Sequence, residues 1–460
     1  MSQTIVKPGQ SLKLKVKRLG INGEGIAYYR RLAIFIPGAL PNEEVQVTIT
    51  TTEAKYAQAK LQQVIKASPQ RITPPCPFYE RCGGCQLQHL AYPAQLTFKK
   101  DLLWQALSKF KPAGWQEYQL LPTIGMTDPW HYRNKAQFQL RYDDHLKKIV
   151  AGLYEGDSHR LVAIDACPVQ LPDTQEAINT LVRLLNKYQL PIFNEKKNSG
   201  ILKTLVVRSG LATGELQVVF VTVTNKLPQK NALLREITER LPQVVSIMQN
   251  VQSRKTSLVM GEETYLLWGK EAISEELAEL RFDLSARAFF QLNPIQTTVL
   301  YGEAAKALDL QDQETLVDAY CGVGTIGLSM AQKAKEVRGM DVIPAAITDA
   351  KNNAAQMGFS NTRYEVGTAE ELLPKWLQEG FRPDAIVVDP PRTGLDVKLR
   401  QALKSYPAKK LVYISCNVST LARDLVELAT VYDVHYLQSV DMFPQTARCE
   451  VVVKLTLKNA

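Results

Sequence analysis

The stretch Thr315-Leu-Val-Asp-Ala-Tyr-Cys-Gly-Val-Gly-Thr-Ile-Gly-Leu-Ser329 carries the pattern G-x-G-x-x-G between an apolar run and a helix-like segment. Its glycines allow the backbone to approach a bound nucleotide closely. Asp341, nineteen positions after Gly322, ends the next predicted strand. There its carboxylate can accept hydrogen bonds from ribose hydroxyls. This order of strand, loop, helix, strand and acid predicts a nucleotide-cofactor site, for either NAD or S-adenosylmethionine.

Strands and helices alternate on both sides of this stretch, from about residue 285 onward. Apolar runs predict strands at 315–320, 335–340, 384–389, 410–415 and 431–437. Helical segments lie between them, for example at 344–357 and 397–405. This alternation is typical of a doubly wound, Rossmann-like α/β sheet with parallel strands.

Asp389 follows one of these strands, in Ala385-Ile-Val-Val-Asp-Pro-Pro-Arg392. An acid followed by two prolines at the carboxyl end of a strand builds a rigid wall that faces the ligand. Base-modifying methyltransferases commonly have such a wall, whereas dehydrogenases have no need of it. Gln291 stands just before the sheet begins, where its side chain could close over the cofactor. These features favour S-adenosylmethionine over NAD.

Cys416 stands just past the end of a predicted strand, in Tyr413-Ile-Ser-Cys-Asn417. A side chain at the carboxyl end of a parallel strand points toward the crevice where ligands bind. Methylation of uracil at C5 needs a thiol there, because C5 is too weak a nucleophile to attack a methylsulfonium directly. Addition of a thiolate at C6 turns the ring into an enolate that can take the methyl group. The alternative interpretation of Cys416 is a buried structural thiol.

Glu450 is the candidate base that this chemistry requires after methyl transfer, when the C5 proton must leave. It stands between Cys449 and three valines, where partial desolvation would raise its pKa toward a useful value. An acid beside an edge strand is often only a salt-bridge partner, which is the alternative here.

Most of the net positive charge lies in the first 71 residues. They hold eleven Lys and Arg against four Asp and Glu, a net charge of +7, whereas the other 389 residues contribute only +2 of the total +9. Alternating runs at 12–17, 32–36 and 45–50 predict a small β-barrel. A basic module of this kind suits a polyanion, since neutralising phosphates releases counterions. A solvated surface that aids solubility is the alternative.

No apolar run approaches the ~20 residues that a membrane helix needs, and the first residues lack the apolar core of a signal peptide. We therefore expect a cytoplasmic protein without a membrane partner. Disulfides are rare in a reducing cytosol, so the seven cysteines are better interpreted as metal ligands or catalytic groups.

Residues 128–282 are mostly strand-like, with helical segments near 173–188 and 230–241. Four cysteines in and before this region could act together as ligands: Cys76, Cys82, Cys85 and Cys167. Four thiolates in a tetrahedral array can hold Zn²⁺ or a cubane iron–sulfur cluster, and the spacing leaves both open. The sequence therefore predicts a β-rich central domain with a metal or cluster site.

Several stretches together resemble the RNA uracil-5 methyltransferase family: Ser415-Cys-Asn417 with Thr420-Leu-Ala-Arg-Asp-Leu425, Asp441-Met-Phe-Pro-Gln-Thr446 with Glu450, Asp389-Pro-Pro-Arg392, and Phe289-Phe-Gln-Leu-Asn293. The resemblance covers nearly the whole chain. It implies that Cys416 is the nucleophile and that Glu450 accepts the proton. It also implies contacts to S-adenosylmethionine from Gln291, Tyr320, Thr325, Asp341 and Asp389.

Three positions depart from the pattern of this family. Asp341 stands where glutamate is usual, Val418 where a proline usually follows Cys-Asn, and Arg448 where a histidine is common. The shorter acid could weaken the ribose contact, the valine could loosen the catalytic loop, and the arginine could contact RNA phosphate. None of the three changes removes a group that does chemistry.

The stretch Cys82-Gly-Gly-Cys-Gln-Leu-Gln-His89 resembles the cluster loop of the ribosomal-RNA branch of the family. This implies a [4Fe–4S] cluster, rather than Zn²⁺, on the four cysteines. The N-terminal barrel is similar to a TRAM domain, a small OB-like module that binds RNA. Candidate RNA contacts are Tyr28-Tyr-Arg-Arg31 and Trp130-His-Tyr-Arg-Asn-Lys135.

We therefore expect a monomer with three domains: a TRAM-like RNA-binding barrel at 1–68, a β-rich central domain with the cluster at 69–284, and a Rossmann-like methyltransferase domain at 285–460. The segment 94–127 could pack on the catalytic domain. The expected substrate is 23S ribosomal RNA, because the tRNA branch of bacteria generally resembles the catalytic part alone; tRNA comes second. Two other classes remain, an NAD-dependent oxidoreductase and a non-catalytic RNA-binding iron–sulfur protein.

Overall fold

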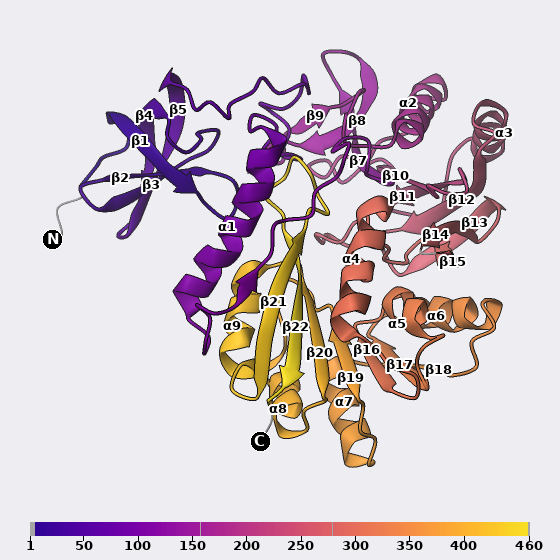
Figure 1. Ribbon diagram of the computed structural model, residues 1–460. Helices are drawn as coiled ribbons and strands as arrows, with labels where there is room; N and C mark the ends of the chain where they lie inside the picture. Colours follow the sequence, from indigo (N-terminus) through magenta and orange to yellow (C-terminus); the bar gives the residue numbers. More distant parts are fainter. Residues whose placement is uncertain (1–4, 157, 278, 459–460) are drawn as a thin grey trace.

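The structure, a computed structural model, describes residues 5–156, 158–277 and 279–458. Figure 1 shows a small barrel beside a larger body, in which one sheet with its helices lies above an α/β sheet. Among the described residues, no helix is both long enough and apolar enough to cross a bilayer.

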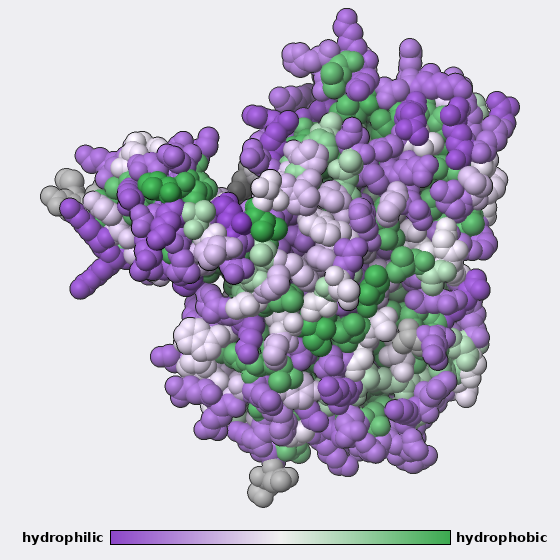
Figure 2. Space-filling model, turned by 45° about the horizontal axis from the view of Figure 1, so that its top comes forward, coloured by the Kyte–Doolittle hydropathy of each residue, from purple (hydrophilic) through white to green (hydrophobic). Residues whose placement is uncertain are grey.

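The barrel is built from β1 (Ser11–Leu19), β2 (Gly25–Tyr29), β3 (Leu32–Ile36), β4 (Glu44–Thr52) and β5 (Tyr56–Lys66). It closes in the order β1-β2-β3-β5-β4. Buried and partly exposed side chains alternate along β3 and β4, because successive residues of a strand face opposite ways. The predicted barrel is confirmed. In Figure 2 it projects from the body, and the surface that it shows is mainly hydrophilic.

The central sheet has the strand order β13-β12-β11-β10-β7-β8-β9. Its strands are β7 (Lys135–Asp143), β8 (Lys148–Tyr154), β9 (Leu161–Ala163), β10 (Leu202–Ser209), β11 (Leu216–Thr222), β12 (Val244–Val251) and β13 (Glu263–Gly269). Helix α2 (Pro172–Lys187) packs on β7, β8 and β10, and α3 (Lys230–Arg240) packs on β12. The hairpin of β14 (Ala272–Leu277) and β15 (Leu280–Ser285) leads from this sheet to the next and shares its core with the α/β part.

The α/β sheet has the order β18-β17-β16-β19-β20-β22-β21-β6. Its strands are β6 (Gln119–Leu120), β16 (Thr315–Ala319), β17 (Glu336–Asp341), β18 (Thr362–Val366), β19 (Ala385–Val388), β20 (Lys410–Ser415), β21 (Tyr432–Val440) and β22 (Glu450–Leu457). The helices are α4 (Pro294–Leu308), α5 (Thr325–Met330), α6 (Pro344–Gln356), α7 (Ala369–Gln378), α8 (Val397–Ser405) and α9 (Val418–Leu428). The predicted alternation of strands and helices is confirmed.

The sheet is not parallel throughout. The strands from β18 to β20 are parallel, but β22 runs antiparallel to both β20 and β21. The physical reason is the short loop at 441–449, since a parallel pair needs a long crossover whereas an antiparallel pair can be joined by a hairpin. The expectation of a parallel sheet is wrong for this edge, and the difference decides which residues meet there.

Helix α1 (Tyr92–Phe110) packs on the α/β part although it precedes the central sheet in sequence. It lies against α9, and its buried Leu103 and Leu107 share a core with Leu421 and Leu425. A proline in its first turn and a left-handed Lys111 at its end suit the two helix termini. Figure 1 shows α1 running between the barrel and the strands β21 and β22.

A buried carboxylate joins the barrel to the segment that follows it. Glu43 has no exposed surface and accepts hydrogen bonds from Arg71 Nε at 2.5 Å, Leu40 N at 2.8 Å and Ser68 N at 3.2 Å. Burial raises the pKa of Glu43, but the bonds from Arg71 and the two backbone groups outweigh it and hold that pKa below its ordinary value. The end of the barrel is thereby fixed to the chain that leads to the cysteines.

We predict that Glu43→Gln lowers the free energy of unfolding by about 2 kcal/mol near neutral pH, because it leaves the partly buried Arg71 without its counter-charge. Folding lowers the pKa of Glu43, so this stabilisation is present above the unfolded-state value of 4.5 and is lost as pH falls through the folded-state value. Thermal unfolding by circular dichroism should separate wild type from variant at neutral pH and bring them together in acid.

The control is Glu44→Gln, which removes the partner of Lys13 in an exposed ion pair. Its effect on unfolding should be negligible, because water and salt screen such a pair. Equal losses in the two variants would contradict the role given to Glu43.

Candidate functional site

Cys416 and Glu450 lie opposite each other on neighbouring antiparallel strands. β20 and β22 pair Ser415 with Val451, and continuing this register by one residue places Cys416 opposite Glu450. Directly opposed residues of an antiparallel pair project their side chains on the same face. Cys416 is half-buried and Glu450 is buried. The predicted nucleophile and the predicted base therefore share one face at the end of β20.

Burial and neighbouring carboxyl charges raise the pKa of both groups. The pKa of Cys416 is raised to about 11, by burial first and then by the charges of Glu450 and Asp389, with Arg392 opposing. Burial raises the pKa of Glu450 well above its ordinary value, Asp389 adds to this, and Arg392 and Arg448 oppose it. The predicted rise in the Glu450 pKa is confirmed. Three acidic groups thus lie close enough to repel one another, with two guanidinium groups nearby.

The loop after β19 is tied to the loop that carries Cys416. Asn417 caps α9, since its side-chain oxygen accepts from Ser419 N at 3.1 Å, and its Nδ2 donates to Arg392 O at 2.9 Å. Asp389 follows β19 directly, and burial raises its pKa to about 7. The acid of the Asp-Pro-Pro wall and the candidate nucleophile are therefore held side by side by the cap of one helix.

Asp341 holds the glycine loop from the end of β17. Its Oδ2 accepts from Gly322 N at 3.1 Å, and its Oδ1 accepts from Ile343 N at 2.9 Å. Gly322 and Gly324 have φ values of +55° and +85°, which few residues other than glycine adopt. The shorter acid at 341 thus reaches the loop backbone directly.

Asp318 is a site residue that sequence reasoning missed. Its Oδ2 accepts from Gly327 N at 2.7 Å, while its buried Oδ1 has no partner among the described residues. Burial raises its pKa to about 7. A Cβ at Gly327 would come within 3.0 Å of this carboxylate, so only glycine fits there. An acid inside the apolar strand β16 was the available signal. The unpaired oxygen beside a glycine cradle fits a bound S-adenosylmethionine.

The other three predicted cofactor residues lie around the same loop. Tyr320 follows β16 with φ +69°, and burial raises the pKa of its hydroxyl above the ordinary value. Thr325 begins α5, and its Oγ1 lies 3.2 Å from the hydroxyl of Tyr301. Gln291 is buried just before α4, and its side chain lies near enough to Tyr301 to lower the pKa of that hydroxyl. Tyr301 therefore connects the segment before α4 to the glycine loop.

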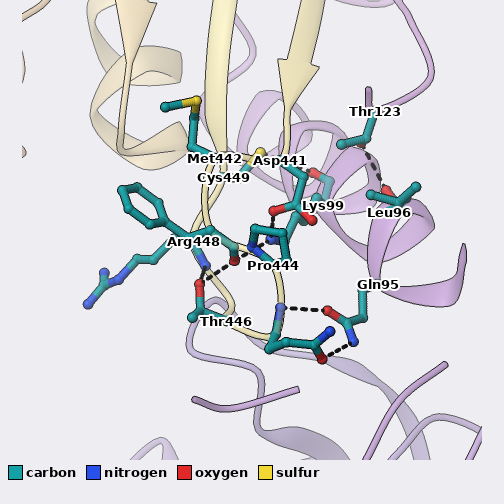
Figure 3. Close-up of polar contacts among 12 residues, drawn as sticks. Gln95, Leu96, Lys99, Thr123, Asp441, Met442, Pro444, Thr446, Arg448 and Cys449 are labelled. Atoms are coloured by element: carbon teal, nitrogen blue, oxygen red, sulfur yellow. Dashed lines mark hydrogen bonds and ion pairs between the residues drawn. The ribbon is translucent and has the colours of Figure 1, made fainter. Parts of the chain in front are cut away.

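The loop at 441–449, here called the base loop, joins β21 to β22 and leads directly into Glu450. Figure 3 shows Lys99 and Gln95 of α1 reaching into it, while Arg448 extends to the other side. Lys99 forms an ion pair with Asp441, and both side chains are fully buried. Sequence reasoning missed Lys99 because its partner is 342 positions away.

The four cysteines Cys76, Cys82, Cys85 and Cys167 line one cavity between the segment before α1 and the end of β9. Gly84 N donates to Cys82 Sγ at 3.4 Å, and backbone N–H groups also face Cys167. Burial raises the pKa of Cys85 to about 12. Among the described residues, no three His, Cys, Asp or Glu side chains are close enough to hold a metal ion as they stand. The convergence of four thiols, with N–H donors toward sulfur, fits a cluster with four thiolate ligands.

The two candidate RNA contacts differ in exposure. At the end of β2, Tyr28 is 48% exposed, and the guanidinium of Arg30 in the following turn lies 5.4 Å from the centre of the Tyr29 ring. This arrangement suits stacking on bases and pairing with phosphates. In the stretch 130–135, however, Tyr132 is buried and donates to Pro444 O at 2.9 Å. This second stretch supports the base loop rather than offering a continuous RNA surface.

Besides Asp341, the other two departures from the family pattern also have defined contacts. Val418 is buried at the first position of α9, so the helix begins without the usual proline. Burial lowers the pKa of the Arg448 guanidinium, whereas the nearby charges of Cys416 and Glu450 act to raise it. Arg448 therefore supplies positive charge to the site rather than standing apart from it.

Comparison with known proteins gives the same assignment. The family model of tRNA (uracil-5-)-methyltransferases matches residues 91–458, and the TRAM domain model matches residues 6–61. The chain is 68% identical over 458 residues to an uncharacterized RNA methyltransferase of Enterococcus faecalis, covering all of both chains. It is 55% identical over 459 residues to one of Listeria monocytogenes, again over the full lengths.

A solved structure is similar over almost the whole chain. It is the Pyrococcus abyssi tRNA (uracil-54, C5)-methyltransferase in complex with S-adenosyl-L-homocysteine, with 28% identity and a TM-score of 0.77. The match covers 97% of this chain and 100% of that one. The methyltransferase prediction is confirmed over the NAD-dependent alternative. The chain belongs to the tRNA (uracil-5-)-methyltransferase family and is an S-adenosylmethionine-dependent RNA methyltransferase with an N-terminal TRAM domain.

Proposed function

We propose that this enzyme methylates C5 of a uridine in 23S ribosomal RNA, with Cys416 as nucleophile and Glu450 as base. The observation that carries the proposal is the β20–β22 register, which sets the two side chains opposite each other beside Asp389. A packing cysteine would have no need of a buried acid across the strand pair. The target uridine must leave its stack to reach this face, so a single-stranded loop is the natural substrate.

The reaction then has three covalent steps. The Cys416 thiolate adds to C6 of uracil, and the electron pair moves to form an enolate over C5, C4 and O4. C5 next takes the methyl group, which S-adenosylmethionine would supply when bound at the glycine loop, with S-adenosylhomocysteine as the leaving group. The carboxylate of Glu450 finally removes the C5 proton, the C5–C6 double bond reforms, and the C6–S bond breaks to return the thiolate.

Electrostatics orders these steps. Cys416 and Glu450 each raise the cost of ionising the other, because two like charges in a buried site repel. Addition at C6 moves the negative charge from the thiolate to the uracil enolate, and methyl transfer to C5 then neutralises it. The carboxylate of Glu450 then becomes less costly to form, at the stage when a base is required. Arg392 favours the charged forms of both Cys416 and Glu450, and Arg448 favours that of Glu450.

Ribosomal RNA is proposed as the substrate because the cysteine loop at 82–89 resembles that of the ribosomal-RNA branch of the family. One finding favours tRNA instead. The P. abyssi protein, whose name gives uridine 54 of tRNA as its target, aligns with this chain over its whole length. An architecture of barrel, central sheet and α/β sheet is therefore compatible with either RNA, and tRNA remains the second candidate.

We further propose a [4Fe–4S] cluster on Cys76, Cys82, Cys85 and Cys167, with Zn²⁺ as the alternative. With four protein ligands, the cluster would leave no iron open for chemistry. Its role would be structural, as a cross-link between residues 76–85 and the segment after β9. We also propose the division into domains at 1–68, 69–284 and 285–460, with α1 and β6 packed on the last. The contacts of α1 with α9 and of β6 with β21 support this packing.

The proposed chemistry predicts covalent trapping by RNA that contains 5-fluorouridine. Fluorine at C5 cannot leave as a proton, so the enzyme should stall as an RNA–protein adduct that survives a denaturing gel. We expect an adduct with 23S ribosomal RNA transcripts and S-adenosylmethionine, and none with Cys416→Ala. An adduct with tRNA alone would move the substrate to tRNA. No adduct with either RNA, in folded protein, would contradict the mechanism.

The cluster proposal predicts about four iron and four acid-labile sulfide per chain in protein purified without oxygen. Cys85→Ala should lose both, together with the broad visible absorbance of the cluster. Cys321→Ala is the matched control, because Cys321 is a buried cysteine of the α/β part and should leave the iron content unchanged. Zinc without sulfide would establish the alternative, and neither metal would refute both.

A further inference from the structure

The base loop depends on α1 for its only buried charge contact among the described residues. Lys99 Nζ pairs with Asp441 and also donates to Phe443 O at 3.1 Å, and the hydroxyl of Tyr92 donates to the second oxygen of Asp441 at 3.0 Å. Neither Lys99 nor Asp441 has exposed side-chain surface. A charge buried in this way is stable only while its partner stays in place, so the pair fixes the start of the loop firmly.

A second contact grips the middle of the same loop. Gln445 N donates to Gln95 Oε1 at 3.0 Å, and Gln95 Nε2 donates back to Gln445 Oε1 at 2.9 Å (Figure 3). Gln445 has φ +69°, a left-handed conformation that costs free energy in a residue other than glycine. Such a conformation persists only where the surroundings hold it. The two hydrogen bonds from Gln95 stabilise this conformation of Gln445 from one side.

The four-cysteine segment holds Gln445 from the other side. The carbonyl of Gln445 accepts from Gln86 N at 3.0 Å and from Leu87 N at 2.9 Å, directly after Cys85. Gln95 Nε2 in turn donates to Leu87 O at 3.0 Å. Gln95 therefore bridges the cysteine segment and the base loop.

The contacts from α1 extend along the base loop to Cys449, the residue before Glu450. Glu450 is the first residue after the base loop, and Cys449 Sγ lies 3.7 Å from Lys99 O. Cys416 is instead followed directly by Asn417, which caps α9 and bonds to Arg392 O. In the described part of the chain, neither Lys99 nor Gln95 bonds to these two segments. A looser base loop should consequently displace the base while leaving the nucleophile in place.

We propose that Lys99 and Gln95 are positioning residues for the last step of the reaction, in which Glu450 removes the C5 proton and the enzyme releases the RNA. The inference rests on the proposed roles of Cys416 and Glu450. It assigns to α1, a helix far from β22 in sequence, control over release of the covalent intermediate rather than over its formation.

The test uses ordinary RNA without fluorine, so that the intermediate is free to resolve. Two variants weaken the contacts between α1 and the base loop. The first is Gln95→Met. The second combines Lys99→Met with Asp441→Asn and so removes both buried charges while the side chains keep nearly the same shape. Single-turnover methyl transfer is measured with labelled S-adenosylmethionine, and the RNA–protein adduct is measured on denaturing gels. We expect release of the RNA to slow by about tenfold or more while methyl transfer changes little, since small misplacements of a catalytic group have effects of this size.

Thr97→Ala provides the matched control on the same helix. Thr97 is exposed, and among the described residues its hydroxyl bonds to Pro93 O and to no atom of the base loop. This variant should therefore resolve the adduct as wild type does. Lys99→Arg, with Asp441 unchanged, keeps the buried positive charge. It should release the RNA faster than the double variant of Lys99 and Asp441.

The outcomes separate the two proposals. Equal slowing of methyl transfer and release, or unchanged release, would show that Lys99 and Gln95 have no specific role in the last step. Failure of wild-type enzyme to trap fluorinated RNA would overturn the proposed mechanism itself. A variant that still forms the fluorinated adduct is folded and able to add Cys416, and where the double variant does not fold, Gln95→Met decides.

Discussion

The antiparallel pairing of β20 with β22 is the constraint on which the site depends. It turns two segments that are 34 residues apart into neighbours, because Ser415 pairs with Val451 and the next residues on each strand are Cys416 and Glu450. A parallel last strand would have placed Glu450 at the other end of the sheet. The reversal of β22, together with the short base loop, therefore brings a thiol and a carboxyl to the same edge as the glycine loop and Asp389.

The sequence was sufficient to predict the parts of the site that rest on local pattern. The glycine loop, its acid Asp341 and the position of Cys416 past a strand all follow from strands that end where ligands bind. The antiparallel edge was not predictable from periodicity, which gives a strand but neither its direction nor its register. Lys99 was missed because its role appears only when distant segments pack, its partner being 342 residues away. Asp318 was missed for another reason: its partner Gly327 is only nine residues away, but an acid inside an apolar strand does not by itself show which backbone group it binds.

The three parts of the molecule converge on the base loop. The barrel is fixed through Glu43 and Arg71 to the chain that leads to the cysteines, and that chain bonds through Gln86 and Leu87 to the carbonyl of Gln445. Helix α1 adds its charged and amide contacts from the same side. A chain of hydrogen bonds and ion pairs therefore connects the segments proposed to bind RNA and a cluster with the loop that precedes the proposed base.

The most direct measurement of the central claim follows the hydrogen on C5. RNA labelled with tritium at C5 of its uridines would be incubated with wild type and with Glu450→Gln, and tritium in water would be counted beside methyl groups on RNA. If Glu450 is the base opposite Cys416, the variant should transfer one methyl group per enzyme and keep the tritium in a covalent adduct. Tritium release at the wild-type rate from Glu450→Gln would show that another group removes the proton.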